Sequence, residues 1–542
     1  MILTGSKVMV KSLEMEGVEV VFGYPGAAIC PFYDALLDSG IRHILTRHEQ
    51  GAAHAASGYA RVTGKMGVCI ATSGPGATNL ITGIATAYMD SIPMVAITGQ
   101  VSSELIGRDV FQEVDITGAA APFCKHSYLV KDTGELPRVI KEAFHIASTG
   151  RPGPVLIDVP IDVQLREIDF KYPETVDIKG YKPTYKGHMM QIKKIADAVK
   201  KAKAPVICAG GGVIYADASE ELKKLVESCR IPVTTTLMGI GVIPSGHELN
   251  MGMLGSHGVF AANYAIHNAD LVIIMGARVG DRAMATADKV AEKAQIVHID
   301  IDPAEIGKNI DVTIPVVGDV KLILEELLQI AEPGDTSKWV QDIKEIKNAH
   351  PLRNRSCGDY SHVKPQYVLS LLSELVGEDD VVTTEVGQNQ IWTANYFQVK
   401  KPRGLITSGG LGTMGYGLPA GVGAKIGRPD AKVIVIGGDG SFQMSIQELG
   451  TIKQNKLGVK IIIFNNSRLG MVRELQKLKY CGRYSQVLLE ENPDFVKLVE
   501  AYGFKGERIT SNYEVEEALK RLLKDDGAYL LECIVDPEES TL

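Results

Sequence analysis

Two short polar motifs in the C-terminal third of the chain have the residue types of a divalent-metal and phosphate site. Gly438-Asp439-Gly440-Ser441 and Asn465-Asn466 each follow an apolar segment with the pattern of a buried strand. The carboxyl ends of neighbouring parallel strands lie at one edge of a sheet, where ligands bind. We therefore expect the Asp439 carboxylate and the Asn466 amide oxygen to lie close together.

These two oxygen ligands suit Mg²⁺, which usually takes one or two protein groups and completes its octahedron with phosphate and water oxygens. The glycines allow the backbone to approach a diphosphate closely. Residues 445–458 between the motifs have the pattern of a crossover helix. Each motif alone is weak, because GDGS is a common turn and Asn-Asn is usually a loop. Together, after two apolar strands, they predict a metal and diphosphate site.

A second candidate group lies near the N-terminus. Glu49 stands between the apolar segment 43–46 and an alanine-rich helical pattern. A glutamate in the first turn of a helix is ordinarily a partner for the helix dipole and nothing more. Residues 68–100 follow, with the pattern of a strand, a glycine turn, a helix and another strand. This segment lacks the Gly-Lys-Ser/Thr of a Walker loop, so a nucleotide phosphate loop is not indicated.

The elements that must position these groups form about three domains, as expected for 542 residues. Short apolar runs alternate with helical patterns throughout, which predicts parallel α/β sheets covered on both faces. We place the domains at residues 1–165, 190–335 and 363–542. The linkers between them are expected at 169–187 and 332–362, where the sequence is polar or charged.

Composition excludes several classes of function. Lys and Arg number 57 against 65 Asp and Glu, a net charge of −8 without a polybasic run, so nucleic acid and membrane surfaces are not expected partners. The apolar runs are too short to span a bilayer, and the N-terminus lacks the apolar core of a signal peptide. A cytoplasmic location is the resulting expectation. The eight scattered cysteines contain no CxxC pair, which favours free thiols.

Several longer segments, together with the GDG…NN pair, closely resemble the thiamine diphosphate (ThDP) enzymes, and among them the acetohydroxyacid (acetolactate) synthases. These segments are 47–61, 68–100, 111–118 and 150–160, and the resemblance covers nearly the whole chain. It implies three doubly wound domains that bind the pyrimidine, a flavin and the diphosphate. It also implies condensation of two pyruvates, or of pyruvate with 2-ketobutyrate, to an acetohydroxyacid and CO₂. Such a reaction serves branched-chain amino acid synthesis or acetoin and butanediol formation.

The resemblance also implies roles for single residues. Glu49 would hydrogen-bond N1′ of the aminopyrimidine, so that the 4′-nitrogen can take the C2 proton of the thiazolium. Gln112 would orient the acceptor, and Met414 would bend the cofactor. Arg278 would either attract the acceptor's carboxylate or pair with a flavin phosphate or a neighbouring Asp. The other implied ThDP contacts are Tyr24, Pro25, Gly26, Pro75, Asn79, Val386, Gly387, Gln388, Gly412, Gly440 and Ser441, with the Arg468 carbonyl on the metal.

In the central domain, the resemblance implies a site for FAD, which takes no net redox part in the family's reaction. The implied contacts are Arg151, Gly210, Gly211, Gly212, Thr236, Leu237, His257, Arg278, Asp300 and Asp319. Because Glu49 and the metal motifs lie in different domains, the family places each site between two chains. A homodimer or homotetramer is therefore implied, and a small regulatory subunit is left open.

This chain departs from the family pattern at five places. Ile161 replaces a usual Lys, Ser256 replaces a Met, residues 277–282 read ARVGDR rather than ARFDDR, and the sequence ends at residues 535–542 without the longer family tail. Leu475 replaces the tryptophan that borders the family's acceptor pocket. FAD binding and the acceptor preference therefore stay open, as does a pyruvate-only, catabolic type. The alternatives are another ThDP-dependent 2-keto acid decarboxylase or a pyruvate oxidase, and, from another class, a flavoprotein without carboligase activity.

Overall fold

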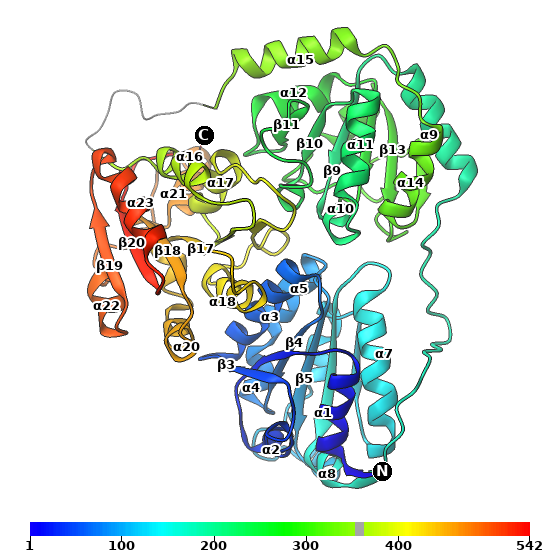
Figure 1. Ribbon diagram of the computed structural model, residues 1–542, viewed down its shortest axis with the longest axis vertical. Coiled ribbons are helices and arrows are strands. Elements are labelled where there is room, and N and C mark those ends of the chain that lie inside the picture. Colours follow the sequence, from blue (N-terminus) through cyan, green and yellow to red (C-terminus); the bar gives the residue numbers. More distant parts are fainter. Residues whose placement is uncertain (353–361, 542) are drawn as a thin grey trace.

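Three six-stranded parallel sheets, one in each of the predicted domain ranges, confirm the predicted fold class (Figure 1). The computed structural model describes residues 1–352 and 362–541. Residues 353–361, part of the expected second linker, lie outside this described part. In Figure 1 the N-terminal and C-terminal domains touch through α3 and α18, and the central domain lies against both.

The N-terminal sheet has the order β3-β2-β4-β5-β7-β6. Its strands are β2 (Val20–Gly23), β3 (Arg42–Leu45), β4 (Gly67–Ala71), β5 (Met94–Gln100), β6 (His126–Leu129) and β7 (Pro154–Pro160). Its helices are α1 (Gly5–Met15), α2 (Cys30–Leu36), α3 (Glu49–Thr63), α4 (Pro75–Asn79), α5 (Ile81–Met89), α6 (Ile116–Ala120), α7 (Leu136–Ser148) and α8 (Ile161–Leu165). Past residue 165, β8 (Glu167–Asp169) still pairs with β1 (Ile2–Thr4) of this domain.

The central sheet has the order β11-β10-β9-β12-β13-β14. Its strands are β9 (Pro205–Ala209), β10 (Val233–Thr235), β11 (Asn250–Met253), β12 (Leu271–Met275), β13 (Gln295–Asp300) and β14 (Ile314–Val317). Its helices are α9 (Met189–Lys201), α10 (Gly211–Tyr215), α11 (Ser219–Cys229), α12 (Phe260–Asn268), α13 (Ala287–Ala291), α14 (Val320–Ile330) and α15 (Ser337–Ala349). Residues 170–188, which lead into this domain, contain neither helix nor strand.

Helix α15 lies inside the expected second linker, yet it is packed on the central domain. Trp339 and Ile343 belong to that domain's apolar core, and the Trp339 indole N–H donates to the Pro205 carbonyl (2.9 Å). Only Trp339, Val340 and Ile343 of the helix are buried. Apart from Ile346 and Ala349, the rest of α15 is charged or polar, which gave this stretch the composition of a linker.

The C-terminal sheet has the order β16-β15-β17-β18-β20-β19. Its strands are β15 (Val381–Thr384), β16 (Leu405–Ile406), β17 (Val433–Gly438), β18 (Val459–Asn465), β19 (Lys505–Ile509) and β20 (Tyr529–Ile534). Its helices are α16 (Pro365–Leu375), α17 (Gln388–Tyr396), α18 (Gly417–Gly427), α19 (Asp439–Phe442), α20 (Leu449–Asn455), α21 (Gly470–Lys479), α22 (Phe495–Ala501) and α23 (Val515–Lys524). The expected crossover between β17 and β18 holds α20 and the short 3-10 helix η6 (Ile446–Glu448).

The N-terminal and C-terminal sheets have the same topology. When the strands of each sheet are numbered along the chain, both have the spatial order 2-1-3-4-6-5. Helix α3 follows the second strand of its sheet, and α18 follows the second strand of the other. The two helices that join the domains are therefore equivalent elements, and the contact is close to a two-fold arrangement.

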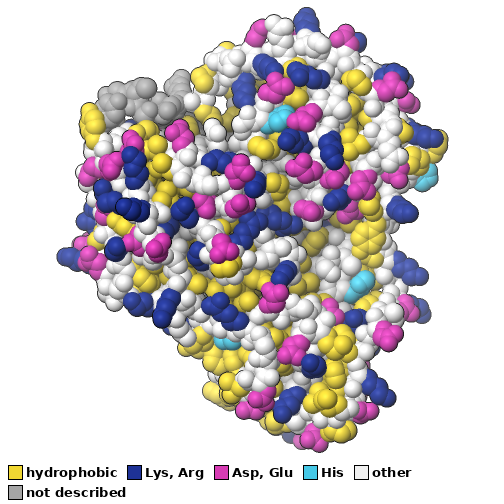
Figure 2. Space-filling view, in the orientation of Figure 1, with side chains coloured by type: hydrophobic (Ala, Val, Ile, Leu, Met, Phe, Trp, Pro, Cys, Tyr) yellow, Lys and Arg dark blue, Asp and Glu magenta, His cyan; other side chains and the backbone are white. Residues whose placement is uncertain are grey.

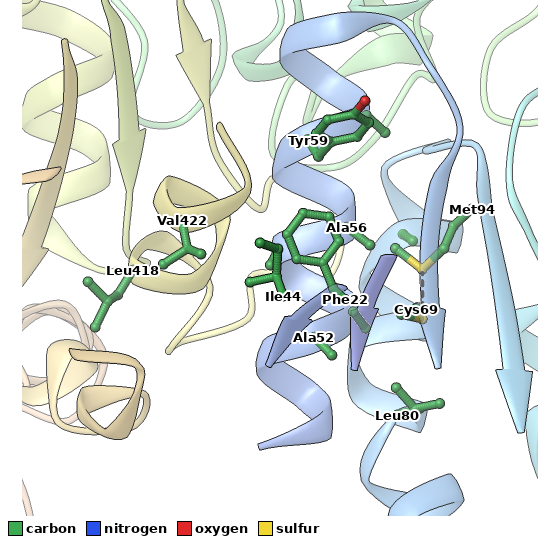
Figure 3. Close-up of a cluster of buried hydrophobic side chains, with 14 of the residues drawn as sticks. Phe22, Ile44, Ala52, Ala56, Tyr59, Cys69, Leu80, Met94, Leu418 and Val422 are labelled. Carbon is green, nitrogen blue, oxygen red and sulfur yellow. Dashed lines mark hydrogen bonds between the residues drawn. The ribbon is translucent and has the colours of Figure 1, made fainter. Parts of the chain in front are cut away.

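Helices α3 and α18 approach each other so closely that backbone meets backbone. A Cβ atom at Gly58 of α3 would lie 2.1 Å from the Ala420 carbonyl oxygen, and one at Gly423 of α18 would lie 1.8 Å from the Ala55 carbonyl oxygen. One continuous apolar core extends across this contact. Figure 3 shows Phe22 of the N-terminal sheet, Ala56 of α3 and Leu418 of α18 in this one cluster.

The distribution of charge on the surface agrees with the mixed charges of the composition. In Figure 2, acidic and basic side chains are intermixed over the visible face. Among the described helices, none combines the length and the apolar character that crossing a membrane requires.

The α3–α18 contact generates a first prediction. Gly58→Ala should lower the free energy of unfolding by about 1–3 kcal/mol, because the new methyl group meets a carbonyl oxygen that cannot move without its helix. Helix propensity acts the other way, since alanine in an exposed helix is more favourable than glycine by about 1 kcal/mol. Denaturant unfolding of the two proteins measures the difference.

Gly40→Ala is the matched control, because nothing lies within 4 Å of a Cβ atom at Gly40. An unfolding midpoint of Gly58→Ala equal to that of the control and the wild type would contradict the backbone contact.

Candidate active site

The two predicted metal ligands follow adjacent strands at the carboxyl edge of the C-terminal sheet. The strand order of this sheet reverses between β15 and β17. The carboxyl edge at such a switch point is the usual ligand site of an open parallel sheet. A cavity of about 70 Å³ lies there. The predicted residues that line it are Val386, Gly387, Gln388, Met414, Asp439, Gly440, Ser441, Asn466 and Arg468. Gly412, two residues before Met414, is not part of this lining.

Asp439 is a buried carboxylate with only amide donors around it. Its side chain is 1% exposed, and Asn492 Nδ2 donates to its Oδ2 (2.6 Å). Burial raises its pKa to about 6, although the Asn492 amide and nearby backbone N–H groups act in the opposite direction. No Lys, Arg or His forms an ion pair with it within the described residues. A buried negative charge without a counter-charge is costly, so Asp439 fits a cation.

Asn466 completes the clamp from the neighbouring strand. Its Oδ1 accepts from the Arg468 backbone N–H (3.1 Å), and its Nδ2 donates to Gln388 Oε1 (2.8 Å). An amide oxygen has two lone pairs, so the first bond leaves acceptor capacity for a metal. Among the described residues, no group of three or more His, Cys, Asp or Glu side chains is placed so that it could hold a metal ion. One carboxylate, one amide and backbone oxygens are the ligand set that suits Mg²⁺ rather than Zn²⁺.

The turn that carries Met414 is fixed by Glu385, which follows β15. Glu385 is fully buried; its Oε2 accepts from the Gly415 N–H (2.7 Å) and its Oε1 from the Leu418 N–H (3.0 Å). Burial raises its pKa to about 7. Gly415 has a φ of +83°, which favours glycine, so the turn beside Met414 has little freedom.

Glu49 and Asn79 meet at the corresponding switch point of the N-terminal sheet, between β2 and β4. Glu49 is the first residue of α3, and its Oε2 accepts from Asn79 Nδ2 at the end of α4 (3.0 Å). A Cβ atom at Gly76 would lie 3.3 Å from the other carboxylate oxygen, so α4 lies directly against it. Tyr24, Pro25 and Gly26 follow β2, and Pro75 begins α4. Gly26 approaches this group through Thr72, whose Cγ2 lies 2.5 Å from a Cβ position at Gly26 and 2.8 Å from one at Gly76.

Gln112 lies over the turn that precedes Pro75. Its backbone is left-handed, with a φ of +58°, and a Cβ atom at Gly74 would lie 2.9 Å from its Cα. Phe111 beside it is 85% exposed. The structure thus places Gln112 next to the Glu49 group rather than next to the metal clamp.

The two halves of the site are separate in one chain. The described residues that line the cavity at Asp439 all belong to the C-terminal domain. Neither Glu49 nor Asn79 is among them.

A larger cavity of about 510 Å³ lies where the central domain meets the other two. Counted along the chain, the central strands have the order 3-2-1-4-5-6, the arrangement of dinucleotide-binding sheets, and the cavity opens at the reversal between β9 and β12. Of the residues predicted to contact FAD, those that line it are Arg151, Gly211, Gly212, Thr236, Leu237, His257, Arg278, Asp300 and Asp319. Gly210 lies behind this wall, where its Cβ position is 2.3 Å from the Gly276 carbonyl oxygen.

Two residues of this lining carry a buried polar atom that forms no hydrogen bond. They are His257, through Nδ1, and Asp90, whose Oδ2 forms an ion pair with Arg61 Nη1 at 3.9 Å. Asp90 is 4% exposed, and burial raises its pKa, while Arg61 and then Arg278 act to lower it. Arg278 acts on Asp90 through its charge, and within the described residues no ion pair joins the two side chains. Arg151 pairs with Asp302 (3.3 Å) and Glu305 (2.9 Å).

Three residues of the site were missed by reasoning from the sequence. Glu385 directly follows a buried strand, as the two metal motifs do, so the sequence contained a signal for it. Asn492 lies in a loop and reaches Asp439 only through the tertiary fold. Glu448 lies in the crossover that was interpreted as an ordinary helix, and it contacts the turn before Glu49.

Comparisons with known proteins agree with this geometry. Three models of thiamine pyrophosphate enzymes match: the N-terminal TPP binding domain at residues 3–119, the central domain at 192–327 and the C-terminal TPP binding domain at 385–533. The chain is 51% identical to the probable acetolactate synthase large subunit of Methanocaldococcus jannaschii, over 99% of this chain and 93% of that protein. It is 49% identical to the acetolactate synthase large subunit of Corynebacterium glutamicum, over 96% of this chain and 84% of that protein.

These matches cover all three sheets and both halves of the site. The chain therefore belongs to the thiamine pyrophosphate enzyme family, in the group formed by the acetolactate synthase large subunits.

Proposed function

We propose that this chain is the catalytic subunit of an acetolactate synthase, which condenses two pyruvates to 2-acetolactate and CO₂. The observation that carries the proposal is the presence of both half-sites, Glu49 with Asn79 and Asp439 with Asn466, in a chain similar over its whole length to proteins of that name. Pyruvate with 2-ketobutyrate is a second substrate pair for the same site.

Bound ThDP would supply a carbanion at C2 of its thiazolium and an electron sink for decarboxylation. Glu49 would hold a proton shared with the ring nitrogen of the aminopyrimidine, and Asn79 would keep that carboxylate in place. Asp439, Asn466 and the Arg468 carbonyl would hold Mg²⁺ and, through it, the diphosphate. Met414, on the turn fixed by Glu385, would press against the cofactor and keep it bent. Gln112 would orient the acceptor keto acid.

The central cavity would hold FAD. The dinucleotide strand order and the lining residues support this ligand. A volume of about 510 Å³ is within the usual range of cofactor pockets. Arg278 would serve the flavin or Asp90 rather than the acceptor in this arrangement.

A homodimer or homotetramer would complete each active site, with Glu49 from one chain and the metal clamp from another. Apolar side chains exposed on α21 support a covered surface beside the clamp: Val472 is 44% exposed, Leu475 44% and Leu478 66%. A small regulatory subunit is a further partner, since the relatives are named large subunits.

A 2-keto acid decarboxylase or a pyruvate oxidase is the alternative from the same family. It would use the same Glu49 and metal clamp but release acetaldehyde, or consume oxygen through the flavin. Assays of all three products separate these activities.

The first experiment incubates the protein with ThDP, Mg²⁺ and pyruvate and measures acetolactate, acetaldehyde and oxygen uptake together. The wild type should form acetolactate, and Glu49→Gln should form it about 10²–10⁴-fold more slowly, because the shared proton is lost. Glu174→Gln, an exposed glutamate of the first linker, is the matched control. Acetaldehyde or oxygen uptake as the main outcome would move the protein to the alternative, and full activity of Glu49→Gln would refute the role of Glu49.

A further prediction concerns Asp439 and pH. Since burial raises its pKa from 3.8 to about 6, its neutral form stabilises the metal-free fold below the ordinary pKa, and this contribution is lost as the pH rises through about 6. Mg²⁺ with ThDP binds the ionised form, so the increase in melting temperature that they cause should be small at about pH 5 and reach a plateau above about pH 7.

Asp439→Asn should show almost no Mg²⁺-dependent increase at any pH. The control is Asp158→Asn, which removes another buried carboxylate whose pKa is raised to about 7, in the N-terminal sheet. A pH-independent response of the wild type to Mg²⁺ would argue against Asp439 as the metal ligand.

Another prediction concerns Leu475, which stands where the family has a tryptophan. Leu475→Trp should raise the preference for 2-ketobutyrate over pyruvate as acceptor about tenfold, since one methylene group in an apolar pocket is worth about 1–3 kcal/mol. Competition between the two keto acids measures the ratio of products. Leu478→Trp, one helical turn further along α21, is the control and should leave the ratio unchanged; equal ratios in all three proteins would remove Leu475 from the acceptor pocket.

A further inference from the structure

The turn before Glu49 is hydrogen-bonded to one carboxylate of the C-terminal domain. Glu448 of η6 is fully buried, and it accepts from the backbone N–H groups of Arg47 (3.0 Å) and His48 (3.1 Å). The Thr451 hydroxyl also donates to it (2.6 Å). Glu448 thus joins a segment 400 positions away in the sequence, directly before the glutamate that would share its proton with the cofactor.

These contacts fix the backbone where a helix start would otherwise be free. The first N–H groups of a helix and of the turn before it have no partner within the helix. The His48 ring accepts from the Gln50 N–H (3.1 Å), and Glu448 accepts from the N–H groups of His48 and Arg47, two and three positions earlier. Gly51 leaves no spare room, because a Cβ atom there would lie 2.4 Å from Glu448 Oε1. The direction in which Glu49 leaves the helix start is therefore set by Glu448.

The N-terminal domain makes an equivalent contact in return. The Thr86 hydroxyl lies 2.7 Å from the Thr413 hydroxyl, and Asp90 Oδ1 accepts from the Gly410 N–H (2.6 Å). Both contacts are to the turn before α18, which carries Met414. Each of the two turns that would touch the cofactor is thus held by the other domain of the same chain.

Glu448 is also close in sequence to the metal clamp. It lies in the same crossover as Asp439, the segment between β17 and β18 that begins with α19 and continues through η6. In the assembly proposed above, this clamp would serve the Glu49 of another chain.

We propose that Glu448 is a positioning residue for Glu49: its buried carboxylate holds the backbone at Arg47 and His48 so that the Glu49 carboxylate is directed at the cofactor's ring nitrogen. This inference rests on the proposed ThDP chemistry. It assigns Glu448 no contact with substrate or cofactor.

A purely cohesive role is the competing explanation, and the chain offers a control for it. The Arg47 side chain binds the same C-terminal element through Gln454 Oε1 (2.8 Å) and the Gly450 carbonyl (3.2 Å). Gln454→Ala removes an interdomain hydrogen bond of the same turn without touching the backbone N–H groups that Glu448 binds. If cohesion alone matters, this variant and a Glu448 variant should behave alike.

The test compares Glu448→Gln, Gly51→Ala and Gln454→Ala with the wild type in three measurements. Glu448→Gln keeps the size of the side chain but turns one acceptor into a donor that faces N–H groups. Gly51→Ala leaves the carboxylate intact and displaces it, so it tests the same contact should Glu448→Gln fold poorly. The measurements are amide hydrogen exchange of residues 45–52 in the cofactor-free protein, the Kd of ThDP with Mg²⁺ from quenching of protein fluorescence, and kcat for acetolactate.

In both Glu448→Gln and Gly51→Ala, the Arg47 and His48 amides should exchange at least tenfold faster. The Kd of ThDP should rise about tenfold, and kcat should fall about a hundredfold. Gln454→Ala should stay within twofold of the wild type in all three measurements. Unchanged exchange and unchanged ThDP affinity in the first two variants would overturn the proposal, as would equal losses in Gln454→Ala. If the wild type binds ThDP but forms no acetolactate, the proposed function fails, and the exchange rates and the Kd still decide the role of Glu448.

Discussion

Helices α3 and α18 meet with backbone against backbone, and the positions of both cofactor-facing turns depend on this contact. Glu49 begins α3, and the turn with Met414 leads into α18. Small residues at the crossing bring the helix starts close enough for each domain to reach the turn of the other. A wider spacing would leave the Arg47 and His48 amides without Glu448.

Buried carboxylates with amide and hydroxyl partners recur at each part of the site. Asp439, Glu385 and Glu448 are almost inaccessible to solvent, and each accepts from N–H groups. Such groups are stabilised only while their donors stay in place, because an unpaired buried charge costs several kcal/mol. Glu385 and Glu448 therefore fix local backbone, whereas Asp439 has acceptor capacity left for a cation. The same residue type thus serves two purposes that burial alone does not distinguish.

Much of the fold could be predicted from the sequence, because strands buried on both faces are continuous apolar runs and their order along the chain is visible. The clamp of Asp439 and Asn466 followed from the same logic, since both stand where such runs end. Helix α15 could not be recognised, because three buried residues in a charged stretch do not differ from a linker. Glu448 was hidden for a related reason: what it binds is the backbone of a segment 400 positions away, and backbone groups leave no mark in the sequence.

The glycines of the α3–α18 contact have a consequence for how this protein can change in evolution. At Gly58 and Gly423 the opposing atoms are the carbonyl oxygens of Ala420 and Ala55, which every amino acid possesses. No substitution in the facing helix can make room for a larger residue at either position. Pairs of side chains on the surface can exchange together, but these positions can only stay the same. The interface that aligns the two turns should therefore be nearly silent in residue co-variation, although it is among the most constrained parts of the chain.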